Sequence, residues 1–219
     1  MWLNLKKKKD TFGFSFKQAI FSGCKNTDSG IGVYAGSPDS YNAFTELFDK
    51  IIEDYHGHKK EAHHVSDMDA SKLKCPPLPA DEAAMIVSTR IRVGRNLAEF
   101  PLGPGLSKEQ RIDIEEKVSE ALTSMDGDLK GTYYSLSTLS EETRNKLIED
   151  HFLFKEGDRF LEAAGLNREW PEGRGIFHNE SKSFLVWINE EDQLRIISMQ
   201  QGADIGVVFE RLSRACAHI

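Results

Sequence analysis

Short apolar runs alternate with polar turns between residues 173 and 201. The runs are rich in β-branched and aromatic residues, whereas the turns at 179–182 and 189–192 hold Asn, Glu, Ser and Asp. Turns of about four residues are too short for the crossover that parallel strands require. The pattern therefore predicts three antiparallel strands, and the second turn places three adjacent carboxylates at one end of the sheet.

Elsewhere the spacing of apolar positions predicts mainly helices. Apolar residues recur every three or four positions. The candidate helix starts are Ser37, which is followed by Pro38, the capping box at 107–110, and Ser140. The predicted helices span about 12–23, 37–55, 107–126, 140–150 and 205–219, and further strands span 85–93 and 131–136. Residues 56–82 lose this periodicity, contain Cys75-Pro76-Pro77, and are predicted to be a linker.

The two sides of this linker differ in their basic residues. Residues 1–89 contain 11 Lys and no Arg, whereas residues 90–219 contain 11 Arg and 6 Lys. Lysine is a strongly hydrated point charge, and arginine offers a planar fork that fits phosphate and carboxylate. The difference indicates two segments with different roles, although surface ion pairs explain arginine enrichment equally well.

Composition narrows the function classes. A net charge of −7 argues against nucleic acid as a partner, and no apolar run approaches the ~20 residues of a membrane span. Three scattered cysteines and the lack of a signal peptide predict a reducing, cytoplasmic location. Four histidines lie between residues 56 and 64, but their spacing matches no zinc motif.

Candidate chemistry gathers on the predicted strands. Arg90 and Arg92 are two residues apart and so share a strand face, where their guanidinium groups repel each other unless an anion lies between them. Glu191 is followed four residues later by Arg195 on the next strand. The alternatives remain open: an exposed arginine pair on an edge strand, a solvated acidic turn, and a plain turn at the glycine-rich residues 28–37.

Five motifs, taken together, resemble the phosphagen (guanidino) kinase family, and most closely its arginine-specific members. The motifs are DSGIGVY at 28–34, FDKIIEDYH at 48–56, STRIR at 88–92, DHFLF at 150–154 and NEEDQLR at 189–195. Their shared order and spacing make the resemblance specific over nearly the whole chain. It implies an α+β fold, with a small all-helical N-terminal domain at 1–82 and a larger catalytic domain at 83–219 built on an antiparallel sheet flanked by helices.

The resemblance also implies a reaction and a site. Members of the family transfer the γ-phosphoryl group of MgATP reversibly to a guanidinium nitrogen, with the metal carried by the nucleotide rather than by protein side chains. The implied nucleotide-binding residues are Ser88, Thr89, Arg90, Ile91, Arg92, His151 and Arg195. The implied residues for the guanidino substrate are Gly30, Ile31, Gly32, Val33, Tyr34 and the catalytic Glu191, and an ion pair between Asp28 and Arg159 is expected to join the domains.

Departures from the family pattern leave alternatives open. Gln193 stands where many members have histidine, and the family's reactive cysteine in a Cys-Pro-[Ser/Thr]-Asn context has no counterpart. The chain is expected to be truncated at both ends and to carry about half of the active site. The alternatives to an arginine-specific kinase are a taurocyamine kinase, and a non-catalytic fragment with residual nucleotide binding.

Overall fold

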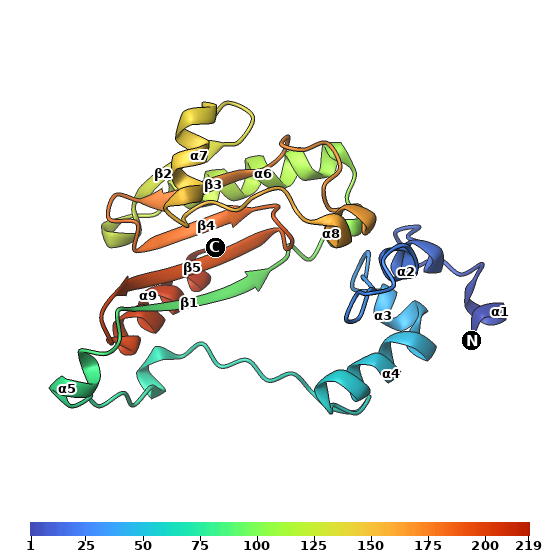
Figure 1. The fold of residues 1–219 in the computed structure, drawn as a ribbon, viewed down its shortest axis with the longest axis horizontal. Helices are drawn as coiled ribbons and strands as arrows, with labels where there is room; N and C mark the ends of the chain where they lie inside the picture. The colour runs from blue at the N-terminus through green and yellow to red at the C-terminus, as the bar shows by residue number, and fades with distance from the viewer. The chain divides into compact units, whose positions relative to one another are not determined.

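The computed structural model describes residues 1–219 (Figure 1), which form two compact units. Unit 1 comprises residues 1–66, 96–110 and 156–170, and unit 2 comprises residues 67–95, 111–155 and 171–219. None of the helices has both the length and the apolar character needed to span a bilayer.

Unit 1 is helical. Its elements are α1 (Trp2–Leu5), α2 (Phe16–Lys25), α3 (Ser40–Ala43), α4 (Thr45–His56), the 3-10 turn η2 (Gly103–Gly105) and α8 (Arg159–Ala163). Its core consists of apolar side chains from α1, α2, α4 and the segments between them, namely Leu5, Phe14, Phe16, Ala19, Ala35, Phe44 and Phe48. The apolar positions of the helix predicted at 37–55 are only partly buried, since Tyr41 of α3 and Tyr55 of α4 are exposed.

Two predicted helix starts in unit 1 are wrong. The helix predicted at 12–23 is α2, which begins at Phe16 rather than near residue 12, because Ser15 and Gln18 form a capping box there. Ser37 caps no helix, since its hydroxyl donates to Asp10 at 2.6 Å in the interior, and α3 begins only at Ser40. In both cases a hydrogen bond to a specific partner decides the boundary.

Unit 2 is built on one antiparallel sheet. Its strands are β1 (Ser88–Arg95), β2 (Gly131–Ser135), β3 (Gly175–Asn179), β4 (Phe184–Ile188) and β5 (Leu194–Gln201), in the order β1-β5-β4-β3-β2. The predicted meander is confirmed, because β3, β4 and β5 pair as antiparallel neighbours. The helices are α5 (Ala80–Ala83), α6 (Lys108–Thr123, most of it in this unit), α7 (Glu141–Glu149) and α9 (Ile205–His218), with the 3-10 turns η1 (Ala70–Lys72) and η3 (Gly127–Leu129).

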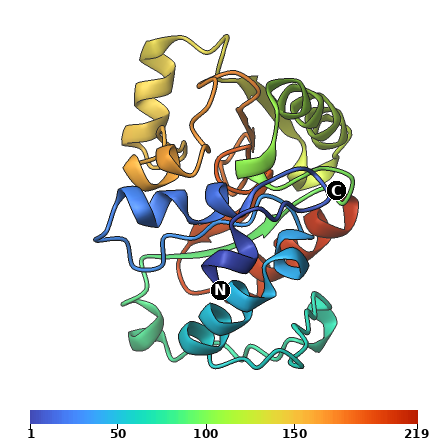
Figure 2. The ribbon, with the colours of Figure 1, turned by 90° about the vertical axis from the view of Figure 1, so that its right-hand side faces the viewer.

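The two faces of this sheet have different surroundings. On one face, Tyr133 donates to Glu115 of α6, and Arg211 of α9 donates to Ser198. The ribbons show α9 running beside β1 and β5 (Figure 1 and Figure 2). Arg90, Arg92 and Gly94 lie on the opposite face of β1, which we call the open face, because side chains alternate along a strand. The α+β fold class expected from the sequence is therefore confirmed.

Candidate active site

Strand β1 presents two arginines on the open face of the sheet. Its burial alternates, with Arg90 and Arg92 exposed and the intervening Ile91 half-buried. Ser88 shares the face of the arginines, whereas Thr89 does not, and the Thr89 hydroxyl donates to the carbonyl of Gly202 at 2.8 Å. Of the residues expected from the STRIR motif, the strand therefore brings three together on one face.

Strand β5 adds a third arginine to this face. Arg195 is directly opposite Gly94 of β1 and Trp187 of β4, and opposed residues in an antiparallel pair share a face. The Arg90 guanidinium lies 5.7 Å from the centre of the Trp187 ring. Arg90, Arg92 and Arg195, which we call the open-face arginines, thus come from two neighbouring strands.

The open-face arginines interact unfavourably with one another. Partial desolvation of the Arg90 side chain lowers its pKa below the usual value, and the positive charges of Arg92 and Arg195 lower it further. An anion bound among these three groups would relieve the repulsion and accept several charge-assisted hydrogen bonds. The geometry is therefore that of an anion-binding surface.

The acidic turn between β4 and β5 faces Arg195. Glu190 Oε2 accepts a hydrogen bond from Arg195 Nε at 2.9 Å, and Glu191 Oε2 accepts one from Nη2 at 3.3 Å. Burial raises the pKa of Glu191, the negative charge of Glu190 raises it further, and Arg195 opposes them. The Glu191 side chain remains 46% exposed, so its carboxylate is accessible to a cationic ligand.

The third carboxylate of the turn packs against β1. A Cβ atom built on Gly94 would lie 2.2 Å from Asp192 Oδ2, so a side chain at this position would displace the carboxylate from its place against β1. The acidic turn is thereby held close to the strand that carries Arg90 and Arg92.

His151 lies on a segment that is tied to the same face. It follows α7 with a φ of 60° and is exposed. The carbonyl of the next residue, Phe152, accepts a hydrogen bond from Trp187 Nε1 at 2.7 Å, and the ring of Phe154 lies 5.5 Å from that of Trp187. Trp187 therefore contacts both this segment and Arg90, a role that its sequence position did not reveal.

The glycine-rich loop belongs to unit 1, where it follows α2. Gly32 has a φ of +70°, and a Cβ there would meet Gly23 Cα at 2.4 Å. The Gly23 amide donates to the Gly32 carbonyl at 2.8 Å, and the Tyr34 amide donates to Ala19 at 2.9 Å. Close backbone packing against α2 therefore fixes the course of Gly30–Tyr34, while Ile31 is 42% exposed.

The expected pair of Asp28 and Arg159 is present. The Arg159 guanidinium donates to the Asp28 carboxylate, and this bond lowers the pKa of Asp28. Both residues belong to unit 1, since residues 156–170 are part of it, so the pair lies within one unit rather than joining two.

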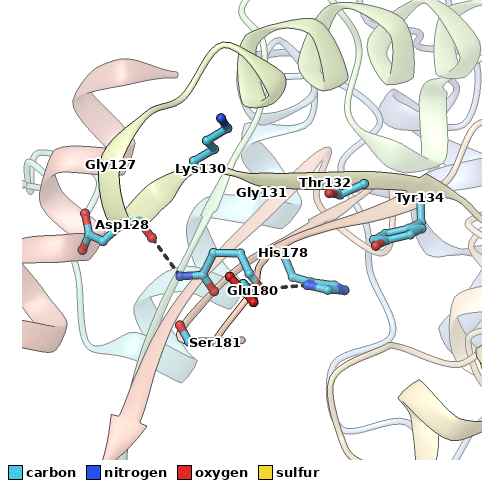
Figure 3. A pocket seen from close by; sticks show the side chains of 10 residues that line it. Gly127, Asp128, Lys130, Gly131, Thr132, Tyr134, His178, Glu180 and Ser181 are labelled. Carbon is cyan, nitrogen blue, oxygen red and sulfur yellow. Dashed lines mark hydrogen bonds between the residues drawn. The ribbon is translucent and has the colours of Figure 1, made fainter.

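A separate pocket lies at the β2–β3 edge of the sheet (Figure 3). Thr132, Tyr134 and His178 line it, and the His178 and Tyr134 rings stack with their centres 5.2 Å apart. None of the residues expected from the sequence motifs lines this pocket. The alternation along β2 and β3 was the one sequence signal that could have indicated it.

The histidine-rich segment lines a hollow of its own in unit 1, where His56, His58, His63 and His64 lie beside Asp49. Among residues 1–219, no three histidine, cysteine or acidic side chains are grouped closely enough to hold a metal ion.

Comparison with protein families identifies the chain. Residues 1–53 match the N-terminal domain of ATP:guanido phosphotransferases, and residues 113–219 match their C-terminal catalytic domain. The chain belongs to the phosphagen kinase family. The first and the last motif used to infer this resemblance both lie within the matched segments.

Individual phosphagen kinases are similar to the chain over almost its entire length. An arginine kinase from Anthopleura japonica is 58% identical over 99% of the chain, and one from Penaeus monodon is 49% identical over 98%. The chain spans 30% of the former and 60% of the latter.

Two solved structures agree with the fold. A taurocyamine kinase from Schistosoma mansoni with bound transition-state analogue components has a TM-score of 0.91 and 39% identity. The match covers 99% of this chain and 30% of the taurocyamine kinase chain. A lombricine kinase has a TM-score of 0.91 and 38% identity, and the match covers 98% of this chain and 59% of the lombricine kinase chain.

Proposed function

We propose that this chain is part of an ATP:guanidino phosphotransferase that reversibly transfers the γ-phosphoryl group of MgATP to the guanidinium group of arginine. Family membership supports the reaction class, and the similarity to two arginine kinases supports the substrate. The observation that carries the proposal is the convergence of the open-face arginines beside the acidic turn.

The open-face arginines would bind the nucleotide phosphates. Phosphoryl transfer depends on in-line positioning and on stabilising negative charge at the phosphoryl oxygens, and preorganised guanidinium groups supply both. Arg90 fits this role, because the positive charges of Arg92 and Arg195 add to the desolvation that lowers its pKa, and a bound anion would offset these charges. Mg²⁺ would enter with the nucleotide as part of the substrate.

Glu191 would bind the substrate guanidinium. A carboxylate accepts two parallel hydrogen bonds from a guanidinium group, which fixes the plane of the attacking nitrogen and draws positive charge away from it. Glu191 already accepts a bond from Arg195 at 3.3 Å and retains an exposed edge. Its position beside an arginine of the phosphate site would place the two substrates next to each other.

The remaining residues of the proposed site have supporting roles. His151 would lie against the adenine ring, and Ser88, Thr89 and Ile91 would shape the nucleotide strand. Gly30–Tyr34 would recognise the amino-acid end of the guanidino substrate. We propose the cytoplasm as the compartment, since all three cysteines are free. The proposed domains are a helical N-terminal domain at 1–82 and a catalytic domain at 83–219.

A coupled assay with MgATP and arginine, taurocyamine or creatine tests the substrate. Arginine should give the highest kcat/KM. If taurocyamine exceeds arginine, the enzyme is instead a taurocyamine kinase, an alternative supported by the similar taurocyamine kinase structure. Turnover with creatine alone would refute both assignments.

A second candidate is a nucleotide-binding chain without turnover. The supporting observation is that the chain spans only 30% to 60% of the length of its relatives. Calorimetry with MgADP, run beside the coupled assay, distinguishes the two, because this candidate predicts heat of binding but no product.

A further inference from the structure

Asn189 stands at the base of the acidic turn, immediately before Glu190. Its φ is +55°, a left-handed conformation that asparagine tolerates better than most residues other than glycine. Its amide N–H donates to the Gln193 carbonyl at 2.9 Å, which closes the turn. The backbone shape of the acidic turn therefore begins at this residue.

The Asn189 side chain attaches the turn to two other segments. Its Nδ2 donates to the carbonyl of Gly173 at 2.7 Å and to the carbonyl of Arg111 on α6 at 3.0 Å. The residue is only 5% exposed, so water does not readily replace these bonds. Both hydrogens of the amide group are thus used to hold the turn in place.

The carboxylates that follow depend on this anchor for their position. Glu190 and Glu191 both accept from Arg195, and Asp192 packs against Gly94. Without the anchor, the turn would keep its charges but would have more freedom to shift relative to β1 and β5. A shift of about 1 Å at a reacting group costs on the order of 100-fold in rate.

We infer that Asn189 is the positioning residue of this site, and that its two buried hydrogen bonds hold Glu191 at the place where a guanidinium group is bound. The inference rests on the proposed function. Asn189 itself would touch neither substrate. Glycine would keep the backbone conformation and lose the anchor, and aspartate would keep the size but could not donate to two carbonyls.

The neighbouring hairpin provides a matched control. Asn179 is 4% exposed, and its Nδ2 donates to the Asp128 carbonyl at 2.8 Å and to Ser183 Oγ at 2.9 Å. The two asparagines therefore have similar burial and each donates twice through Nδ2, while Asn179 Oδ1 also accepts from the Phe184 amide. The turn after Asn179 carries none of the proposed catalytic groups. Asn179→Gly should lower the melting temperature at least as much as Asn189→Gly does, because it loses one more hydrogen bond and only Asn189 has the positive φ that glycine suits.

The experiment measures kcat, both KM values and thermal unfolding for Asn189→Gly, Asn189→Asp and Asn179→Gly. Both Asn189 variants should lose about 10- to 100-fold in kcat while the KM for MgATP changes by no more than about twofold. Asn179→Gly should stay within about twofold of the wild type in both parameters. Equal losses at the two asparagines, or an Asn189→Gly enzyme with the kcat of the wild type, would overturn the inference.

A second measurement separates this inference from the proposed function. A pH titration followed by carboxyl ¹³C NMR gives the pKa of Glu191. This pKa should differ from that of the wild type in both Asn189 variants, and it should be unchanged in Asn179→Gly. A wild-type chain without turnover would refute the proposed activity and leave this readout intact. An unchanged Glu191 titration in a folded Asn189→Asp chain would show that Asn189 does not position the carboxylate.

Discussion

Two arginine clusters in unit 2 show how the same residue type serves different purposes. The open-face arginines lie on β1 and β5, and Arg90 and Arg92 form no ion pair within residues 1–219. The second group, which we call the α9 cluster, joins Arg211 and Arg214 to Asp128 and Glu210.

The pKa shifts in the two clusters have opposite directions. In the α9 cluster, hydrogen bonds from Arg214 and Arg211 lower the pKa of Asp128, and the pKa of Arg214 is raised. Among the open-face arginines, burial and neighbouring positive charge lower the pKa of Arg90. The arginines of the α9 cluster are paired with their own carboxylates, whereas among the open-face arginines only Arg195 has carboxylate partners, and Arg90 and Arg92 have none.

Among the variants that test this comparison, Glu191→Gln should have the largest effect, a loss of kcat. Removing the charge that holds a guanidinium group should reduce kcat by about 100- to 1000-fold in the coupled assay, as the loss of one preorganised catalytic group does. Glu210→Gln in the α9 cluster is the control and should keep its kcat. If both variants are equally active, Glu191 has no catalytic role.

The same substitution should not destabilise the fold. The pKa of Glu191 is raised in the folded chain, so the carboxyl group holds its proton more tightly when the chain is folded than when it is unfolded. The free energy of unfolding therefore falls as the pH rises from about 4.5 through the folded pKa. Glu191→Gln removes that penalty. Denaturant unfolding at pH 7 should therefore show a variant at least as stable as the wild type.

Arg90→Gln should weaken nucleotide binding by about 10- to 100-fold, since a hydrogen bond to a charged group contributes roughly 1.5–3 kcal/mol. Its melting temperature should stay the same or rise, because the variant relieves repulsion with Arg92 and Arg195. Calorimetry with MgADP and a thermal scan measure the two quantities. A clear loss of stability with unchanged affinity for MgADP would show that Arg90 stabilises the fold, as the arginines of the α9 cluster do, and does not bind the nucleotide.

Asp128→Asn should show the reverse behaviour, with a stability loss of about 1 kcal/mol, discounted for solvent exposure, and normal nucleotide binding. The pKa of Asp128 is lowered on folding, so its contribution is present above about pH 3.8 and is lost as the pH falls through the folded value. Unfolding curves from pH 7 to pH 2 should therefore converge for variant and wild type at the acid end. Curves that stay parallel would contradict this account.

Arg214→Gln should have the smallest effect, about 0.5 kcal/mol, because the side chain is 44% exposed and Arg211 remains to pair with Asp128. The difference should shrink in high salt, which screens exposed ion pairs. A loss larger than that of Asp128→Asn would mean that the ion pair between Arg214 and Glu210 also contributes to stability.

The sequence determined the local elements where one pattern dominated. The apolar runs of β3 to β5 with the polar turns between them, the capping box before α6 and the Ser140 cap of α7 each depend on neighbouring residues, so they could be predicted without a structure. The shared face of Arg90 and Arg92 follows from the alternation of side chains along a strand. The family motifs likewise required only the order of residues.

Tertiary structure alone decided which residues lie together. Arg195 joins Arg90 and Arg92 because β5 pairs with β1, strands that lie about a hundred residues apart in sequence. The interior bond from Ser37 to Asp10, the contacts of Trp187 and the anchor at Asn189 likewise depend on partners far along the chain. Strand pairing and side-chain burial set these contacts, and neither is encoded within any one local segment.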